Sequence, residues 1–323
     1  MASILASVVI PSYNCAPWLE RSVLSALALS RDQIEVVIVD DGSVDDTPRI
    51  CDDLKERHPQ VRVIRQTNSG LSMARNAGIA ISRGDYIILL DADDVLAPFD
   101  LASLVSGDFD LIRVGVEIKQ LDGTCEYKRD SFGPAKGVNY LKDRLRAESF
   151  FIASWAYFYR RQWLQEQGLK FVPGLLHEDH VFTIEAILKA QSFIERNTLA
   201  YHYFIREGSI TTALDSERIC LRIASLIYIV EHLYGCMKQH PDINFIDWLR
   251  YNIDTCYYLS QKIESLVFNW PILKMELRLM TYHLYRRDFR SARGVTWRVR
   301  RAFEAVLFSR LGRHSLKFKP ASA

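Results

Sequence analysis

The chain has 323 residues, of which 49% are hydrophobic, and carries 41 Lys and Arg against 39 Asp and Glu. This composition is typical of a globular protein, and the length favours two domains at about 150 residues each. A net charge of +2 argues against a dedicated nucleic-acid-binding protein, which would usually concentrate a basic excess on one face. None of the six cysteines forms a pair at the two-residue spacing of a zinc or redox site, so we expect reduced thiols.

The first ten residues lack the basic segment of a signal peptide and lead directly into Pro11, so no such peptide is expected. No apolar run reaches the roughly 18 residues of a membrane-spanning helix. We therefore expect a cytoplasmic protein, and contact with the cytoplasmic face of the inner membrane stays open.

Apolar runs rich in β-branched residues alternate with helical patterns over the first hundred residues. The runs 7–10, 35–40, 61–64 and 85–91 predict strands, and the segments 18–29, 46–57 and 71–81 between them predict helices. This alternation predicts right-handed βαβ units and an α/β fold, with a Rossmann-like, mostly parallel sheet flanked by helices. Ligands of such sheets bind at the carboxyl ends of the strands.

Carboxylates gather at these predicted strand ends. Asp40 and Asp41 follow the second strand, and Asp91, Asp93 and Asp94 follow the fourth. Like charges repel one another unless a cation or a donor-rich ligand compensates them. Hard carboxylate oxygens suit Mg²⁺ or Mn²⁺, so the Asp-Ala-Asp spacing predicts a metal site, with a polar turn or a helix cap as the alternative.

Two absent motifs narrow the chemistry. The chain has no P-loop and no Gly-x-Gly-x-x-Gly after the first strand, which excludes a P-loop ATPase and disfavours a dinucleotide dehydrogenase. A pyrophosphate would then be held by a metal and basic side chains, and Arg75 is a candidate because it precedes the strand that leads to Asp91.

Four segments in order and at suitable spacing resemble family two glycosyltransferases of the GT-A fold: 8–14 (VVIPSYN), 39–43 (VDDGS), 68–78 (NSGLSMARNAG) and 84–94 (GDYIILLDADD). Segments around 177–182 and 203–211 resemble later parts of the same domain. The resemblance implies inverting transfer of a sugar from a UDP-sugar to a hydroxyl of a glycan or lipid-linked acceptor, in lipopolysaccharide, capsule or related polysaccharide synthesis.

The resemblance also implies roles for individual residues. Asp179 corresponds to the catalytic base, with a helix N-terminal carboxylate as the alternative reading, and Asp93 to the Mn²⁺ or Mg²⁺ ligand. The nucleotide-sugar would be bound by Pro11, Tyr13, Asp41, Asn68, Arg75, Asp91, Ala92, Arg206 and Ser209. His177 and His202 stay open between metal ligands and structural histidines, and Trp155 and Tyr157 between sugar-stacking and core residues.

Beyond residue 214 the strand patterns end and long helical patterns begin. We expect a catalytic domain over 1–214 and a helical domain over 215–323. Residues 286–319 hold eleven Lys and Arg against two acids, a net charge of +9 interleaved with apolar residues. This segment either lies on an anionic membrane or packs on the protein or an oligomer partner, and a homo-oligomer stays open.

Two other functions stay open beside the transferase. A nucleotidyltransferase would use a related sheet and a metal, but it would show a Gly-rich, Arg-containing loop where this chain has Pro11 to Asn14. A noncatalytic nucleotide-sugar-binding subunit would carry the same motifs without turnover.

Overall fold

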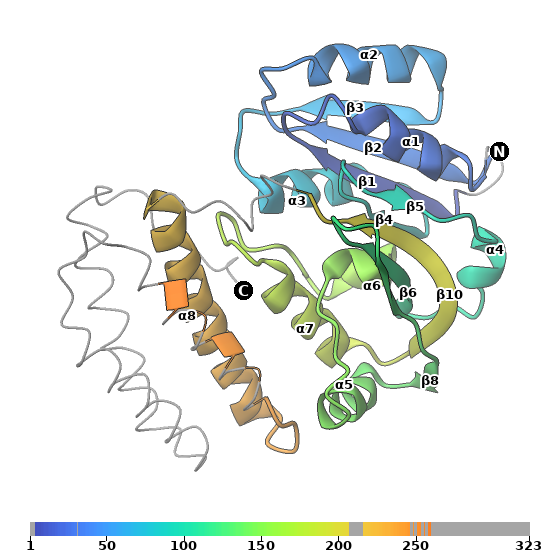
Figure 1. Ribbon diagram of the computed structural model, residues 1–323. Coiled ribbons are helices and arrows are strands. Elements are labelled where there is room, and N and C mark those ends of the chain that lie inside the picture. The colour runs from blue at the N-terminus through green and yellow to red at the C-terminus, as the bar shows by residue number, and fades with distance from the viewer. Residues whose placement is uncertain are drawn as a thin grey trace.

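The computed structural model describes residues 4–30, 32–206 and 216–245 and six further positions between 248 and 259. Helices and strands alternate through its first part, as the sequence predicts (Figure 1). The strands are β1 (Ala6–Ser12), β2 (Ile34–Asp40), β3 (Val61–Arg65) and β4 (Tyr86–Leu89), and the helices are α1 (Leu19–Leu27), α2 (Thr47–Arg57) and α3 (Leu71–Ile81).

The remaining elements extend this sheet and cover it. They are β5 (Val95–Leu96), α4 (Leu101–Leu104), β6 (Leu111–Lys119), β7 (Cys125–Lys128), β8 (Phe132–Ala135), α5 (Gly137–Arg146), a 3₁₀ turn (Ser154–Ala156), β9 (Tyr157–Arg160), α6 (Arg161–Glu166), α7 (Asp179–Lys189), β10 (Phe193–Phe204) and α8 (Ser216–Gln239). The segment 219–236, which the sequence predicts to be helical, lies within α8.

One sheet of ten strands runs through the described part of the chain, in the order β3-β2-β1-β4-β9-β6-β10-β5, with β7 paired to β6 and β8 to β10. The four predicted strands are parallel to one another. Beyond β4 the pairing changes, because β9 is antiparallel to both of its neighbours. The fold is therefore mixed α/β, and the mostly parallel arrangement predicted from the sequence holds for β1 to β4.

Burial of apolar side chains explains how these strands and helices pack together. Every residue of β1, β2 and β4 is buried, as expected for strands covered on both faces. α3 approaches this sheet closely because Gly78 has no side chain: a Cβ there would lie 2.3 Å from Cγ1 of Val9. Close packing of α3 brings Arg75 of that helix to the carboxyl edge of the sheet.

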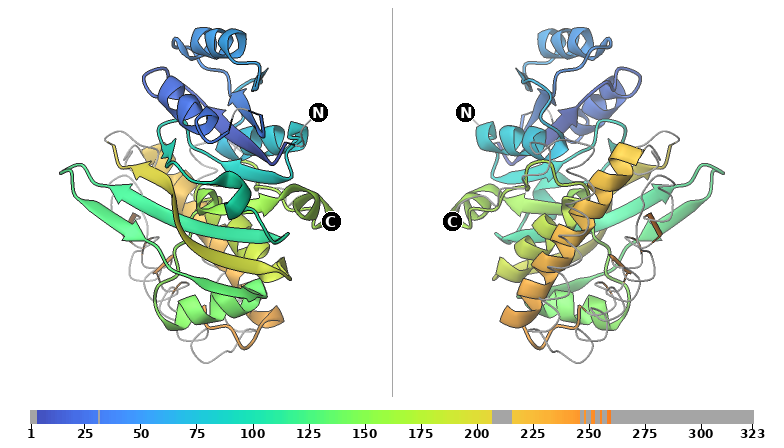
Figure 2. Two further views of the ribbon diagram at one scale, coloured as in Figure 1. Left: turned by 90° about the vertical axis from the view of Figure 1, so that its right-hand side faces the viewer. Right: turned by 90° about the vertical axis from the view of Figure 1, so that its left-hand side faces the viewer.

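α8 covers the molecule on the side of α7, and the right-hand view in Figure 2 shows it running across that face. It buries Ile219, Ile223, Leu226, Ile229, Val230 and Leu233. No helix in the described residues is both long and apolar enough to cross a membrane. The predicted helical patterns beyond residue 259 and the basic segment 286–319 lie outside the described residues.

Candidate active site

Three adjacent strand ends meet at one edge of the sheet. β1 lies between β2 and β4, so the turn after Pro11, the Asp40–Asp41 pair and the Asp91–Asp94 loop are neighbours there. Pro11 is buried as part of β1, whereas Tyr13 is 50% exposed beyond it. The edge therefore offers an accessible aromatic ring next to buried carboxylates, as the sequence predicts.

Asp41 organises the loop that leads into α3. Its carboxylate accepts hydrogen bonds from Nε2 of Gln66 at 2.7 Å and from the backbone N–H groups of Ser69 and Gly70, both at 2.8 Å. Asn68 lies in this loop and is exposed. Asp41 thus fixes the position of Asn68 and of the start of α3, and its predicted contact with a nucleotide base stays a prediction.

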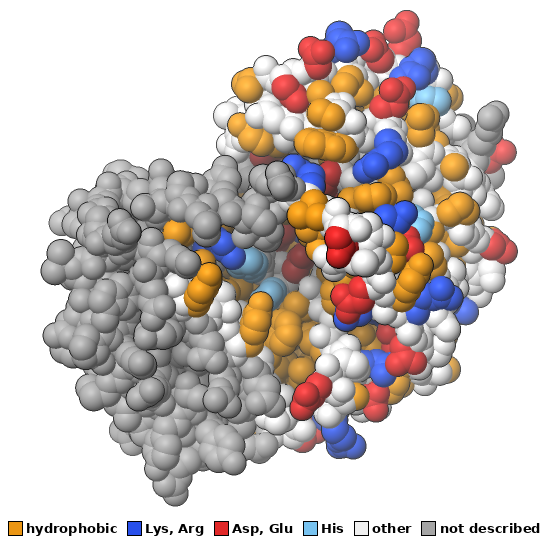
Figure 3. Space-filling model, viewed as in Figure 1, with side chains coloured by type: hydrophobic (Ala, Val, Ile, Leu, Met, Phe, Trp, Pro, Cys, Tyr) orange, Lys and Arg blue, Asp and Glu red, His pale blue; other side chains and the backbone are white. Residues whose placement is uncertain are grey.

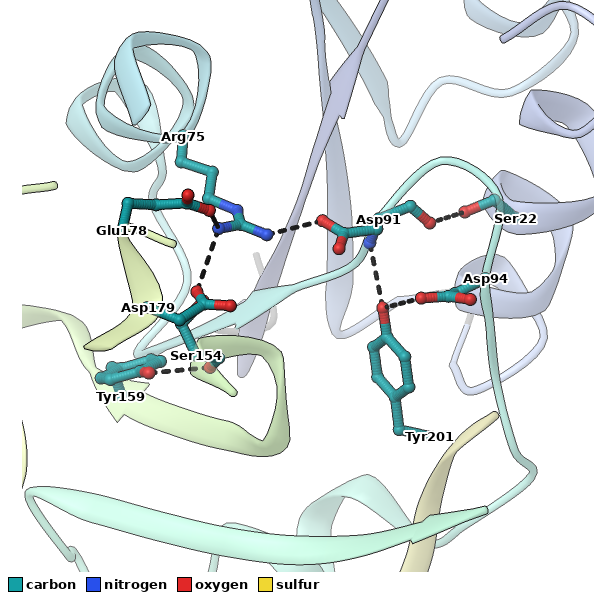
Figure 4. A network of polar contacts seen from close by, with 9 residues as sticks. All are labelled: Ser22, Arg75, Asp91, Asp94, Ser154, Tyr159, Glu178, Asp179 and Tyr201. Atoms are coloured by element: carbon teal, nitrogen blue, oxygen red, sulfur yellow. Dashed lines mark hydrogen bonds and ion pairs between the residues drawn. The ribbon is translucent and has the colours of Figure 1, made fainter. Parts of the chain in front are cut away.

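The guanidinium of Arg75 joins carboxylates from two distant parts of the chain (Figure 4). Nη2 lies 2.7 Å from Oδ1 of Asp91, and Nη1 lies 2.6 Å from Oε1 of Glu178 and 3.2 Å from Oδ1 of Asp179. The Arg75 side chain is only 1% exposed. One buried cation therefore connects the strand end that carries the Asp-Ala-Asp motif with the start of α7.

Charge balance at this point depends on Arg75. Burial alone would lower the pKa of its guanidinium, but the charges of Asp91, Asp179 and Glu178 together raise it, so it stays protonated. Burial and the neighbouring Asp179 charge raise the pKa of Glu178 to about 7. The two adjacent carboxyl groups also differ in exposure. Glu178 is buried, whereas Asp179 is 22% exposed and can reach a ligand.

Asp179 is oriented from a second side. Oγ of Ser154 donates to its Oδ1, and the Ser154 carbonyl accepts from the hydroxyl of Tyr159 at 2.7 Å. The alternative prediction for Asp179, a carboxylate at the N-terminus of a helix, agrees with its place, because Asp179 is the first residue of α7. Its side chain, however, is engaged by Ser154 and Arg75, which holds it at the carboxyl edge.

Asp93 is paired with Arg206 rather than with a buried partner. Nε of Arg206 donates to Oδ2 of Asp93, and the guanidinium lies 4.4 Å from the ring centroid of Trp18. Arg21 contacts the same turn, because its Nη2 donates to the Asp93 carbonyl at 2.6 Å. Asp93 is 24% exposed and Arg206 35%, so this pair lies at the surface of the site.

Asp94 has a structural role that the sequence did not reveal. It is fully buried and accepts from the hydroxyl of Tyr201 and from the backbone N–H of Phe204, both at 2.8 Å. Burial and the nearby charges of Asp91 and Asp93 raise its pKa well above the ordinary value. The same Tyr201 oxygen accepts from the Asp91 N–H at 3.1 Å, so β10 fixes the whole acidic turn (Figure 4).

The three acidic side chains of this turn therefore differ in what they can bind. Asp91 is held by the buried Arg75 and Asp94 by β10, whereas the partner of Asp93, Arg206, is itself partly exposed, so Asp93 is the carboxylate that a cation reaches by displacing a surface ion pair. No group of three His, Cys, Asp or Glu residues within the described ranges is arranged to hold a metal ion. A hard divalent cation fits Asp93 when the ligand's phosphates supply other oxygens, since Mg²⁺ commonly uses one or two carboxylates plus substrate phosphates.

The remaining predicted residues fall in different places. Ala92 is buried within the acidic turn, and Ser209 lies outside the described residues. His202 pairs with Glu117 through Nδ1, which favours the structural interpretation. Trp155 and Tyr157 are buried, and Trp155 stacks on Tyr201 with ring centroids 4.3 Å apart, which favours the core interpretation for both.

Comparison with known proteins relates the chain to one family of enzymes. Residues 7–166 match the family model described as glycosyl transferase family 2. The chain is similar to YibD of Escherichia coli, described as an uncharacterized glycosyltransferase, with 28% identity over 64% of this chain and 62% of that protein. It is also similar to ExoO of Rhizobium meliloti, a succinoglycan biosynthesis protein, with 32% identity over 67% of this chain and 65% of that protein.

The chain spans less than two thirds of the length of these two curated relatives. Among solved structures, residues 1–349 of S. aureus TarS in complex with UDP-GlcNAc match with a TM-score of 0.58 and 18% identity, over 99% of this chain and 98% of that one. At this identity the likeness shows the fold, which is of the GT-A type. The similarities do not favour the nucleotidyltransferase or the noncatalytic subunit.

Proposed function

Because the chain belongs to glycosyltransferase family 2, we propose that it transfers a sugar from a UDP-sugar to a hydroxyl of a glycan or glycolipid acceptor, with inversion at the anomeric carbon. The proposed pathway is the synthesis of a polysaccharide, a capsule or a lipopolysaccharide. The observation that carries this proposal is the Arg75 bridge, which connects Asp91 on the donor side with Asp179. A displacement reaction needs both ends of such a site at a fixed separation.

The donor nucleotide is proposed to lie over the ends of β1 and β2. Tyr13 is exposed enough to stack on a uracil ring, and Pro11 forms the floor beneath it. Asp41 holds the loop that presents Asn68, and its carboxylate oxygens accept hydrogen bonds, as recognition of a base N–H requires.

The diphosphate is proposed to lie beside Asp93 and Arg206. A bound Mn²⁺ or Mg²⁺ would act there as a Lewis acid on the leaving diphosphate. Asp93 would hold this ion, Ala92 and Asp91 would line the ribose side, and Arg206 with Ser209 would neutralise phosphate charge. Trp18 and Arg21 support this region, because Trp18 lies against the Arg206 guanidinium and Arg21 holds the backbone of Asp93.

Asp179 is proposed as the base that removes the acceptor hydroxyl proton during attack on the anomeric carbon. It is the more exposed of the two adjacent carboxyls, and Ser154 and Arg75 hold it in place. Glu178 is proposed as a positioning residue, because its buried carboxyl orients the same guanidinium.

A nucleotide screen tests this proposal. Thermal unfolding is measured with UDP, GDP and CMP in the presence of Mn²⁺, and UDP release is then measured from several UDP-sugars. We expect stabilisation by UDP above the other nucleotides and release of UDP from at least one donor. Equal stabilisation by all three nucleotides, or no UDP release from any donor, would contradict it.

Peripheral contact with the cytoplasmic face of the inner membrane is proposed for residues 286–319, on the strength of their sequence alone. Their net charge of +9 contrasts with −7 for residues 1–285. Anionic lipid surfaces attract such segments by about 1 kcal/mol per basic residue. Flotation of the full chain with phosphatidylserine vesicles should decrease when Arg298, Arg300 and Arg301 are changed to Glu, and unchanged recovery would contradict membrane contact.

A further inference from the structure

Five side chains lie near one another next to the start of α7. The ring centroids of His177 and His180 are 5.8 Å apart, those of His180 and Trp248 5.3 Å, and those of Trp248 and Tyr251 5.8 Å. Arg222 of α8 lies near both ends of this row, because it interacts electrostatically with Tyr251 and with His177. We call these five residues the α7–α8 cluster.

The α7–α8 cluster contains buried polar atoms that have no partner. Nε2 of His177, Nδ1 of His180, Nε of Arg222 and Nε1 of Trp248 are all buried without a hydrogen bond. Such atoms are rare in proteins, because each loses its hydration without gaining a partner. Their concentration in one place indicates a ligand that accepts hydrogen bonds, since the guanidinium and indole N–H groups can only donate.

Arg222 also carries a charge that burial disfavours. It forms no ion pair with any acidic side chain in the part of the chain that the structure describes, and burial lowers the pKa of its guanidinium. The two histidines do not add to this charge at neutral pH, because burial lowers the pKa of His177 to about 4 and that of His180 to about 3. The cluster therefore presents a single, poorly solvated positive charge, which favours an anion.

The cluster lies directly beside Asp179. His177 is two residues before it, has a left-handed backbone with φ of 59°, and interacts electrostatically with both Asp179 and Arg222. Oγ of Ser225, one helical turn after Arg222, accepts from the N–H of Leu176 at 3.0 Å and so ties α8 to this loop. A left-handed non-glycine residue is uncommon and is often found at functional sites.

Aromatic rings of different exposure border the cluster. Figure 3 shows histidine side chains close to basic, acidic and hydrophobic ones on this face of the molecule. Tyr251 is 59% exposed, and the ring of the partly buried Phe150 lies 5.9 Å from that of Trp248. Exposed aromatic faces next to hydrogen-bond donors suit a sugar ring that carries a charged group.

We propose that the α7–α8 cluster is an acceptor subsite that binds an oxyanion, either a phosphate or a carboxylate, attached to the acceptor close to the hydroxyl that Asp179 deprotonates. Arg222 supplies the charge, Trp248 and the histidines supply neutral hydrogen bonds, and Tyr251 contacts the adjoining sugar. This inference rests on the proposed function, because it assigns the chemical class of the acceptor.

Calorimetric titration tests the proposal in the presence of saturating UDP and Mn²⁺, so that the donor site is occupied. The probes are inorganic phosphate, methyl β-glucuronide and the neutral methyl β-glucoside. We expect the wild-type chain to bind at least one of the two anions and to bind the glucoside at least tenfold more weakly. The anion that binds more tightly identifies the acceptor's charged group as a phosphate or a carboxylate.

Arg222→Met should weaken the binding of that anion at least tenfold, with Arg222→Lys in between, whereas UDP affinity changes less than twofold. Trp248→Phe keeps the ring and removes the donor, so it should weaken the anion severalfold. Arg49→Met, which removes an exposed arginine of α2, is the matched control and should leave both affinities unchanged.

Equal binding of the anion to wild type and Arg222→Met would overturn the proposal, as would binding of the glucoside as tight as that of either anion. If UDP binds and neither anion does, this inference fails while the proposed function stands. If wild type does not bind UDP, the proposed function fails. If Arg222→Met also loses UDP affinity, anion binding by Arg222→Lys and Trp248→Phe is compared with wild type instead, and unchanged binding in both would overturn the proposal.

Discussion

Replacement of Arg75 by Met tests whether this residue neutralises the site. Arg75→Met keeps the length and volume of the side chain but leaves Asp91, Glu178 and Asp179 without their shared cation. Removal of one partner from a buried ion pair typically destabilises a protein by about 3–5 kcal/mol, because the remaining charges stay buried. We expect a loss of that size in the free energy of unfolding at pH 8.

The pH dependence separates charge repulsion from lost packing. Burial and the Asp179 charge raise the pKa of Glu178 and Arg75 lowers it, so without Arg75 the pKa of Glu178 rises further above its unfolded value. The folded variant then binds more protons than the unfolded chain at mildly acidic pH, so the deficit relative to wild type should shrink as the pH falls from 8 to 5. Urea unfolding, monitored by tryptophan fluorescence at both pH values, measures this deficit.

Two further variants make this test specific. Glu178→Gln removes one of the three charges, so adding it to Arg75→Met should restore part of the lost stability at pH 8. Arg49→Met breaks exposed ion pairs with Asp46 and Asp53 and should cost less than about 1 kcal/mol. A loss below about 1 kcal/mol for Arg75→Met, or the same loss at pH 5 and pH 8, would refute the assigned role.

Three further predictions concern the other groups of the site. Asp179→Asn should keep UDP affinity and lower transfer by about 10²-fold or more, the contribution typical of a general base, and wild-type turnover would remove Asp179 from that role. Asp93→Ala should abolish Mn²⁺-dependent UDP release, and release by wild type that persists in EDTA would contradict metal binding. Tyr201→Phe should lower the free energy of unfolding by about 1–3 kcal/mol, measured in urea, because the Asp91 N–H and the buried Asp94 lose their shared partner. Unchanged stability would show that Tyr201 does not hold the acidic turn.

The first part of the fold, β1 to β4 with the helices between them, could be predicted because its signals are local. The apolar runs of β1, β2 and β4 are strands buried on both faces, and the acidic residues at the ends of β2 and β4 share one edge because parallel strands end together. The segment 71–81, predicted as a helix, has the bounds of α3. At these positions the apolar pattern of the sequence matches the burial in the structure, so these elements could be predicted from the sequence alone.

The connections between distant segments could not be predicted in the same way. The partners of Arg75 on α7 are 103 and 104 residues away, and no spacing encodes such a contact. Tyr201 was missed because β10 mixes buried and half-buried residues with aromatic ones and shows no clean alternation. Arg222 and Trp248 belong to the helical part, where an unpaired buried donor is visible only after the chain has folded.

The most direct test of the central claim needs no acceptor glycan. Slow hydrolysis of a UDP-α-sugar identified in the nucleotide screen can be followed by proton NMR, which resolves the anomeric protons of the released sugar before mutarotation. An inverting site with Asp179 as its base predicts that the β-anomer appears first and that Asp179→Asn abolishes its formation. First release of the α-anomer would contradict inversion, and unchanged hydrolysis by Asp179→Asn would contradict the assigned base.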